Sequence, residues 1–501
     1  MSQQLMTTGH GSLRRTPEPS HSSIQGRNLG RVNAPPLFGQ MFPSLADEPH
    51  SASDAALKAL GEAMLESDVD PSGDTANIPA GFTYLGQFVD HDITLDTTPL
   101  SKVINDPLAI ENFRTPALDL DSLYARGPGD TNYLFDRNDP EKFLIGVTQP
   151  VGSLRAMPND LPRNPQGLAI IGDHRNDENL LVAQTHLAFL KFHNAVIDHL
   201  RSKAPTLTGD ALFVEARRIV TWHYQWIVLF DFIERLTEPG LVRRIKNEGR
   251  KIYRFKKRPY MPIEFATAVY RLGHSMVRER YSHNAHFADT GFDLLFLFSG
   301  LSGRIGNDFE TLPSNWIIDW RRFYAINETN PASVPLNMAR KIDPLLAREL
   351  HQLPDGSSLP ERNLLRGRLR SLPSGQAVAR FVRGKVGTPV MTPAQIATGP
   401  DGAVARQHGM DADSPLWYYI LKEAQVLGNG GERLGPLGSR IVAEVFLGLV
   451  AGDVNSFIRD ENAFGGKWSP DKEDHPLPSK TPGAFTMADM LRFVDDISPV
   501  G

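Results

Sequence analysis

Residues 86–95 read GQFVDHDITL, and this short stretch concentrates polar side chains that are costly to bury. An amide, an imidazole and two carboxylates fall within six residues, at Gln87, Asp90, His91 and Asp92. On a helix, Gln87 and His91 stand four residues apart and therefore share a face. The ordinary alternative for such a segment, taken alone, is a helix end with solvated acids.

Two further segments carry candidate chemistry. Residues 173–179, DHRNDEN, come just before a strongly predicted helix; a capping role for Asn176 or Asp177 would explain the acids but not Arg175. His274 follows Gly273 in the segment YRLGHSM. A lone histidine on a helix is usually a satisfied core residue. Alternatively, the missing side chain of Gly273 lets a flat ligand approach, with His274 as an axial ligand of haem iron.

Composition narrows the class of protein. The chain has 501 residues, of which 41% are hydrophobic and 22% charged, which is typical of a soluble globular protein and excludes collagen, coiled coil and wholesale disorder. The net charge of −5 disfavours a nucleic-acid partner, and we interpret the basic stretch 243–258 as a solvated face. Cysteine is absent, so any metal must be held by histidine, carboxylate, hydroxyl or carbonyl groups.

The pattern predicts a mostly α protein with few short strands. Residues 1–50, rich in Ser, Pro, Gly, Gln and Arg, are predicted to form an extended or partly disordered arm, and residues 51–501 a single large helical domain. Apolar periodicity predicts helices at 53–65, 179–200, 209–236, 264–280, 337–352, 361–370 and 432–451, with loops over 100–165. No apolar run is long enough to span a bilayer and the N-terminus lacks a signal-peptide pattern, so the default expectation is the cytoplasm, with leaderless secretion left open.

Five blocks together resemble the animal-type haem peroxidases, members of the peroxidase–cyclooxygenase superfamily. They are GQFVDHDITL (86–95), GDHRNDENLL (172–181), FHNAVI (192–197), YRLGHSMVR (270–278) and NLLRGRLRSLPSG (363–375). Their order and spacing are similar to the family's over roughly residues 75–495, which implies a single helical haem peroxidase domain. The resemblance is strongest to the shorter bacterial members and to the catalytic domains of lactoperoxidase and myeloperoxidase.

The resemblance implies catalytic roles on the distal side of a haem. His91 occupies the position of the distal histidine, Gln87 that of the distal glutamine, and Arg175 that of the distal arginine. A methionine that bonds to a haem vinyl group in myeloperoxidase is replaced by Asn179, so a sulfonium link is excluded.

The resemblance also implies the residues that hold haem b. His274 matches the proximal iron ligand, and Asn363 matches the asparagine that accepts a hydrogen bond from its imidazole. Arg271 matches a partner of the haem propionates. Asp90 and Glu178 match the carboxylates that form ester bonds to the haem.

A calcium site is implied beside the distal histidine. Asp92 resembles its first ligand, and the loop TPALDLD (115–121) would supply the rest from Thr115, Ala117, Asp119 and Asp121. Alternate residues of this loop offer oxygen donors, as Ca²⁺ requires. A solvated acidic turn is the ordinary alternative.

The expected function is a haem peroxidase that uses hydrogen peroxide, through a ferryl intermediate, to oxidise iodide, bromide, thiocyanate or aromatic donors. One alternative is a haem-dependent fatty-acid dioxygenase of the same superfamily, whose radical-forming tyrosine would stand three residues before the proximal histidine. Here that position is Arg271, and Tyr270 lies one residue earlier. The other alternative is a catalytically silent haem- or calcium-binding structural protein.

Overall fold

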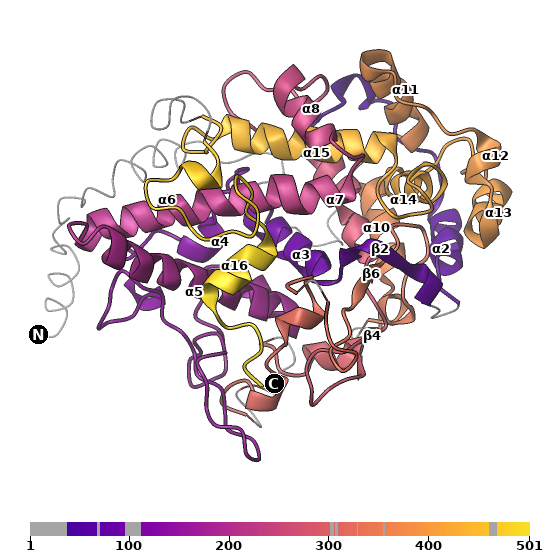
Figure 1. Ribbon diagram of the computed structural model, residues 1–501. Helices are drawn as coiled ribbons and strands as arrows, with labels where there is room; N and C mark the ends of the chain where they lie inside the picture. Colours follow the sequence, from indigo (N-terminus) through magenta and orange to yellow (C-terminus); the bar gives the residue numbers. More distant parts are fainter. Residues whose placement is uncertain are drawn as a thin grey trace, which may run out of the picture.

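Helices make up most of the regular structure in the computed structural model of the protein (Figure 1). The structure describes residues 38–67, 71–95, 112–300, 305, 309–327, 329–353, 356–459 and 468–500. The α-helices are α2 (Asp54–Ala63), α3 (Gly81–Ile93), α4 (Asp121–Tyr124), α5 (Leu180–Lys203), α6 (Gly209–Ile227), α7 (Glu234–Leu236), α8 (Leu241–Glu248), α9 (Ile263–Thr267), α10 (Leu359–Leu369), α11 (Gly375–Val386), α12 (Pro393–Ile396), α13 (Gly399–Gln407), α14 (Leu416–Leu427), α15 (Pro436–Gly452) and α16 (Met487–Val494). The prediction of a mostly α fold is confirmed.

Strands are few and short, as expected. In the described part of the chain they form three two-stranded sheets. β1 (Phe38–Gly39) runs parallel to β3 (Met261–Pro262), β2 (Asp74–Pro79) antiparallel to β6 (Met338–Arg340), and β4 (Arg280–Tyr281) antiparallel to β5 (Thr290–Gly291). The first two sheets join segments that are distant in sequence, whereas β4 and β5 are close neighbours along the chain.

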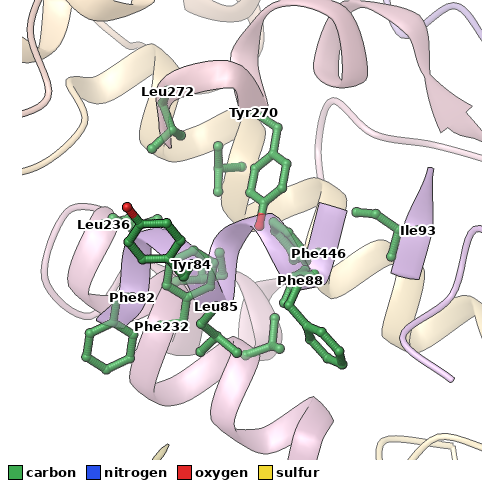
Figure 2. Packing of buried hydrophobic residues seen from close by; sticks show 14 of the residues in the cluster. Phe82, Tyr84, Leu85, Phe88, Ile93, Phe232, Leu236, Tyr270, Leu272 and Phe446 are labelled. Atoms are coloured by element: carbon green, nitrogen blue, oxygen red, sulfur yellow. The ribbon is translucent and has the colours of Figure 1, made fainter. Parts of the chain in front are cut away.

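Helix α3 lies at the centre of the core. Its residues Phe82, Leu85 and Phe88 are buried and pack against side chains from other helices, including Phe232 (Figure 2). Helices α3, α5 and α6 contact one another in series, and α3 also contacts the 3₁₀ segment η7 (Val269–His274). Within the described residues, none of the helices combines the length and apolarity needed to cross a bilayer.

The two long helices form close to their predicted bounds. Asn179, not Asn176 or Asp177, caps α5, because its side chain accepts a hydrogen bond from the amide of Val182. The predicted helix 209–236 is continuous but passes from α6 through a π-helical stretch, η6 (Val228–Ile233), into α7. Ser53 caps α2 as expected.

The predicted helix 264–280 is wrong in its extent. Helix α9 ends at Thr267, because the backbone of Ala268 leaves the helical region, and the chain continues as η7 only to His274. His274 therefore ends a tight 3₁₀ segment instead of lying in the middle of a helix. The aromatic rings of Phe265 and Tyr270 stack across the break with centroids 5.0 Å apart.

The predicted helix 337–352 is also wrong. The chain forms strand β6 and a short 3₁₀ segment, η11 (Arg348–His351). Pro344 lies between them and cannot donate a backbone hydrogen bond, so a continuous helix is interrupted there. Other helices have no counterpart among the predicted ones, and α4 forms within the predicted loops 100–165; these helices are α4, α8, α11, α12, α13, α14 and α16.

The end of the predicted N-terminal arm packs onto the domain. Phe38, Met41 and Phe42 are buried, and the backbone amides of Met41 and Phe42 donate to the carboxylate of Glu264. Residues 38–50 therefore belong to the folded body and not to an extended arm. Residues 1–37 lie outside the described residues.

Candidate active site

His91 lies in the last turn of α3, and one nitrogen of its ring is held in place. Its Nδ1 is 2.8 Å from Oδ1 of Asn176, and its Nε2 has no hydrogen-bond partner among the described residues. Burial, followed by the nearby positive charge of Arg175, lowers the pKa of His91 to about 4. The ring is therefore neutral at physiological pH and offers one nitrogen for proton transfer.

Arg175 is clamped beside His91. Its Nε and Nη2 donate to the two carboxylate oxygens of Asp173 at 3.1 and 2.7 Å, and Nη2 also donates to the main-chain carbonyl of His91 at 2.8 Å. Asp173 is buried, yet hydrogen bonds and charge from Arg175 and Arg114 hold its pKa below the usual range against the effect of burial. The guanidinium therefore keeps one edge fixed, while Nη1 makes no hydrogen bond within the described residues.

Gln87 and Glu178 meet on the same side of α3. Nε2 of Gln87 donates to Oε1 of Glu178, and Oε1 of Gln87 accepts from Nδ2 of Asn179 at 3.1 Å. Burial raises the pKa of Glu178 to about 7, against the opposing charge of Arg175. Asp90, one turn away, accepts a hydrogen bond from the hydroxyl of Thr94. The structure thus gathers the predicted amide and both carboxylates around the polar face of α3.

His274 mirrors the arrangement of His91. Nδ2 of Asn363, on α10, lies 2.7 Å from Nδ1 of His274, and a half-turn of this amide places its oxygen there instead. Nε2 of His274 has no hydrogen-bond partner among the described residues. Burial, followed by the charges of Arg271 and Arg366, lowers the pKa of His274 to about 3. A neutral imidazole with one nitrogen held and the other available is the form that binds a metal.

The segment that ends in His274 is tied to α3. The hydroxyl of Tyr270 donates to the main-chain carbonyl of Gly86 at 3.1 Å, and Figure 2 shows its ring reaching the α3 ribbon.

Several residues of these mostly buried segments are partly exposed. They are Gln87, Asp90, Arg175, Glu178, Arg271, Gly273 and His274. A Cβ at Gly273 would meet no atom within 4 Å.

These observations test whether the residues suit a haem, and they do. The partly exposed set comprises an available imidazole, two carboxylates and two arginines, and open space adjoins the backbone of Gly273. An imidazole is a common axial ligand for haem iron, and a glycine allows a flat ring to come close. The donor chemistry of the site therefore matches the group that the sequence predicts.

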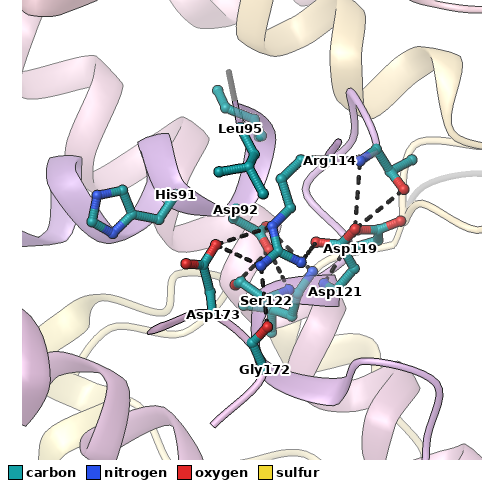
Figure 3. Close-up of polar contacts among 12 residues, drawn as sticks. His91, Asp92, Leu95, Arg114, Asp119, Asp121, Ser122, Gly172 and Asp173 are labelled. Carbon is teal, nitrogen blue, oxygen red and sulfur yellow. Dashed lines mark hydrogen bonds and ion pairs between the residues drawn. The ribbon is translucent and has the colours of Figure 1, made fainter. Parts of the chain in front are cut away.

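A second cluster lies on the other side of His91. The carboxylates of Asp92, Asp119 and Asp121 offer oxygens that all lie within 4.8 Å of one another (Figure 3). Asp92 also accepts from the hydroxyl of Ser122 at 2.8 Å, and Oγ1 of Thr115 lies 3.3 Å from Oδ2 of Asp121. Burial, followed by the negative charge of Asp121, raises the pKa of Asp92.

This cluster suits calcium. Three close carboxylates and a threonine hydroxyl are hard oxygen donors, and a divalent cation would relieve their mutual repulsion. Ala117 is buried in the same loop. The structure thus brings together Asp92, Thr115, Asp119 and Asp121, as the sequence predicts.

Three contributors were missed from the sequence. The sequence suggests only a capping role for Asn176, but its side chain binds His91. Arg114 joins Asp121 to Asp173, and Arg366 places positive charge near His274. The position of Asn176 between Arg175 and Glu178 is the available signal, whereas nothing in the sequence links Arg114 to Asp173, which lies 59 residues away.

A helical body that presents two amide-held imidazoles, with arginines and acids around them, defines a haem protein of the peroxidase type. The model of the animal haem peroxidase family matches residues 106–385, more than half of the chain, and this range contains Arg175, Glu178, His274 and Asn363. The chain belongs to the animal haem peroxidase family.

Relatives and solved structures agree with this family. A peroxidase-like protein of Margaritifera margaritifera is 25% identical over 247 residues, 39% of this chain and 31% of the relative. Human eosinophil peroxidase is 27% identical over 224 residues, 42% of this chain and 29% of the relative. The chain thus spans about a third of the length of these relatives.

Among solved structures, peroxidase A from Dictyostelium discoideum is similar to this chain with a TM-score of 0.60 and 15% identity, covering 93% of this chain and 94% of that one. The fatty acid alpha-dioxygenase of Oryza sativa gives a TM-score of 0.55 and 14% identity, covering 93% and 78%. At this identity both show a shared fold and do not distinguish the two activities.

Proposed function

We propose that this protein is a haem peroxidase that uses hydrogen peroxide to oxidise small anions, such as iodide, bromide or thiocyanate, or small aromatic donors. One observation carries the proposal: His91 and His274 are each held at Nδ1 by an asparagine amide, and each keeps Nε2 available. The hydrogen bond from the hydroxyl of Tyr270 to the carbonyl of Gly86 joins η7, which carries His274, to α3, which carries His91.

The residues around these histidines would hold haem b. His274 would bind the iron through Nε2, with Asn363 fixing its ring, and Arg271 would neutralise a propionate. Asp90 and Glu178 are the proposed ester-forming carboxylates, and burial raises the pKa of Glu178 against the charge of Arg175. When bound, the haem supplies the redox chemistry that cleaves the peroxide O–O bond.

The other side chains would move protons and stabilise charge. Nε2 of His91 would accept a proton from one peroxide oxygen and return it to the other, which is general acid–base catalysis. Arg175 stays charged and would stabilise the negative charge that develops on the departing oxygen. Gln87, held by Glu178 and Asn179, would orient water or a halide above this site.

The fatty-acid dioxygenase remains the second candidate because the fold is shared. Two observations count against it: Arg271 occupies the position three residues before His274, and the hydroxyl of Tyr270 is bonded to the carbonyl of Gly86. A silent structural protein would not need the clamped arrangement of Arg175 beside an available His91 nitrogen.

The test combines an optical spectrum with a donor screen. The purified protein should show a Soret band and should oxidise iodide, thiocyanate or a phenol when peroxide is added. His91→Ala should retain the Soret band and slow the peroxide reaction by about 100-fold or more. His408→Ala, a change at an exposed histidine, serves as the control. A protein that takes up oxygen with linoleate, and ignores peroxide, would contradict the proposal.

A further inference from the structure

Asn176 is fully buried, and its side chain bridges two histidine rings. Its Oδ1 lies 2.8 Å from Nδ1 of His91, and its Nδ2 lies 3.0 Å from Nδ1 of His186, on α5. Nε2 of His186 is buried and has no hydrogen-bond partner among the described residues. Within the described residues, the bridge is therefore the one hydrogen bond that the His186 side chain makes.

No backbone role accounts for this side chain. Asp173 caps the 3₁₀ segment η5 (His174–Asp177), and Asn179 caps α5. Both polar atoms of the Asn176 side chain are instead engaged by imidazoles. An amide buried for packing alone would be costly at this position, because leucine has nearly the same shape and needs no partner.

The chemistry of the bridge determines which nitrogen of His91 carries the proton. An amide oxygen accepts hydrogen bonds and cannot donate them, so Nδ1 of His91 must be the protonated nitrogen. Nε2 then keeps its lone pair, which is the form that a proton acceptor requires. On the other side, the amide NH₂ donates to Nδ1 of His186, so both ends of the amide have a partner in this orientation.

We propose that Asn176 is a positioning residue that fixes the tautomer of His91, and that His186 anchors the Asn176 amide for this task. The inference rests on the proposed role of His91 as the proton acceptor. Phe88 supports the arrangement, because its ring packs edge-on against His186 with centroids 5.9 Å apart. Because His91 lies on α3 and His186 on α5, the bridge also couples these two helices. Asn176 is 85 residues from His91 and 10 residues from His186 in sequence.

The experiment compares two nearly isosteric variants of the full chain. Asn176→Leu removes the acceptor, whereas Asn176→Asp retains an oxygen for Nδ1 of His91, with Nδ1 of His186 becoming the donor on its other side. Asn194→Leu is the matched control, since that amide on α5 binds the backbone of Phe143 and no histidine.

Two readouts are needed. The first is the tautomer of His91, read from ¹⁵N chemical shifts of ¹⁵N-histidine-labelled, haem-loaded protein in its diamagnetic carbon monoxide form, with the signal assigned by its loss in His91→Ala. The second is the rate constant for the reaction with peroxide, measured together with KM for iodide.

Asn176→Leu should populate the Nε2–H tautomer and slow the peroxide reaction about tenfold or more, with KM for iodide unchanged. Asn176→Asp and Asn194→Leu should keep the wild-type tautomer, and His186→Phe should shift it in the same direction as Asn176→Leu. If Asn176→Leu binds no haem and therefore lacks a Soret band, the tautomer of His91 in His186→Phe tests the inference instead.

The inference is overturned if the tautomer is the same in Asn176→Leu and wild type, or if Asn176→Asp loses as much rate as Asn176→Leu. Failure of the proposed function is distinct: the wild type would then bind no haem, or His91→Ala would keep the wild-type rate.

Discussion

Nη2 of Arg114 lies 2.5 Å from Oδ2 of Asp173, and this contact links the acidic cluster to the clamp beside His91 (Figure 3). Arg114 also lies 3.4 Å from Asp121, so one guanidinium touches both sites. Asp173 in turn holds Arg175. The acidic cluster and the proposed catalytic arginine are therefore parts of one charge network.

Arg114→Met should destabilise the protein substantially. The substitution leaves the buried carboxylate of Asp173 with a single arginine, and breaking a buried ion pair costs about 3 kcal/mol. Thermal unfolding monitored by circular dichroism measures the effect. Arg280→Met, which removes an exposed pair with Asp289, should leave the midpoint nearly unchanged. Equal shifts in the two variants would contradict a network centred on Asp173.

Calcium removal should lower the unfolding midpoint, because the proposed ion would bind the folded state through Asp92, Asp119 and Asp121. At a free Ca²⁺ concentration about 100 times Kd, removing the ion should lower the free energy of unfolding by about 2.7 kcal/mol. Differential scanning calorimetry with and without a chelator measures it, and added Ca²⁺ should restore the midpoint. Asp119→Asn should respond far less to either treatment. A wild-type midpoint that ignores the chelator would exclude this site.

Haem should remain attached after acid–organic extraction once peroxide has been added, since Asp90 and Glu178 are the proposed ester partners. Glu178→Gln should weaken the attachment, and the double variant with Asp90→Asn should release all the haem. The absorbance of the extracted protein measures the retained fraction. Glu215→Gln, at a carboxylate that pairs with Arg218, is the control. Full release from the wild type would refute covalent attachment.

His283→Phe should reduce the loss of stability in acid. Burial, followed by the charge of Arg322, lowers the pKa of His283 from 6.5 to about 3. As the pH falls below 6.5, the unfolded chain binds a proton that the folded protein refuses, so stability is lost as the pH falls toward 3. Phenylalanine has no nitrogen to protonate, and its flat ring can still stack on Trp316 as His283 does.

Between pH 6.5 and pH 4.5, protonation linked to His283 should lower the free energy of unfolding by about 2.7 kcal/mol at most, because two pH units correspond to this amount for one proton. Urea unfolding at several pH values measures it for the wild type and for His283→Phe. His286→Phe, at an exposed histidine, should unfold with the pH dependence of the wild type. The same slope in all three proteins would show that His283 is not the responsible group.

Much of the site could be predicted from the sequence because its parts are local. The spacing of Gln87 and His91 requires only a helix, and α3 forms one. Pairs such as Arg175 and Glu178 lie within one motif, and the amide beside His274 was predicted from the block that contains Asn363. The apolar pattern likewise located α5, α6 and α15, the last of which is buried on all sides from Leu437 to Val450.

By itself, the sequence determined the class of fold and the family resemblance, and through that resemblance it indicated the candidate residues of the site, because motifs of neighbouring residues carry this information. Only the tertiary structure decided that Asn176 bridges His91 and His186, that Arg114 reaches Asp173, and that the helix before His274 breaks at Ala268. These outcomes join residues up to 85 positions apart, and such contacts are selected by packing and by the need to satisfy buried polar groups, for which local periodicity carries no signal.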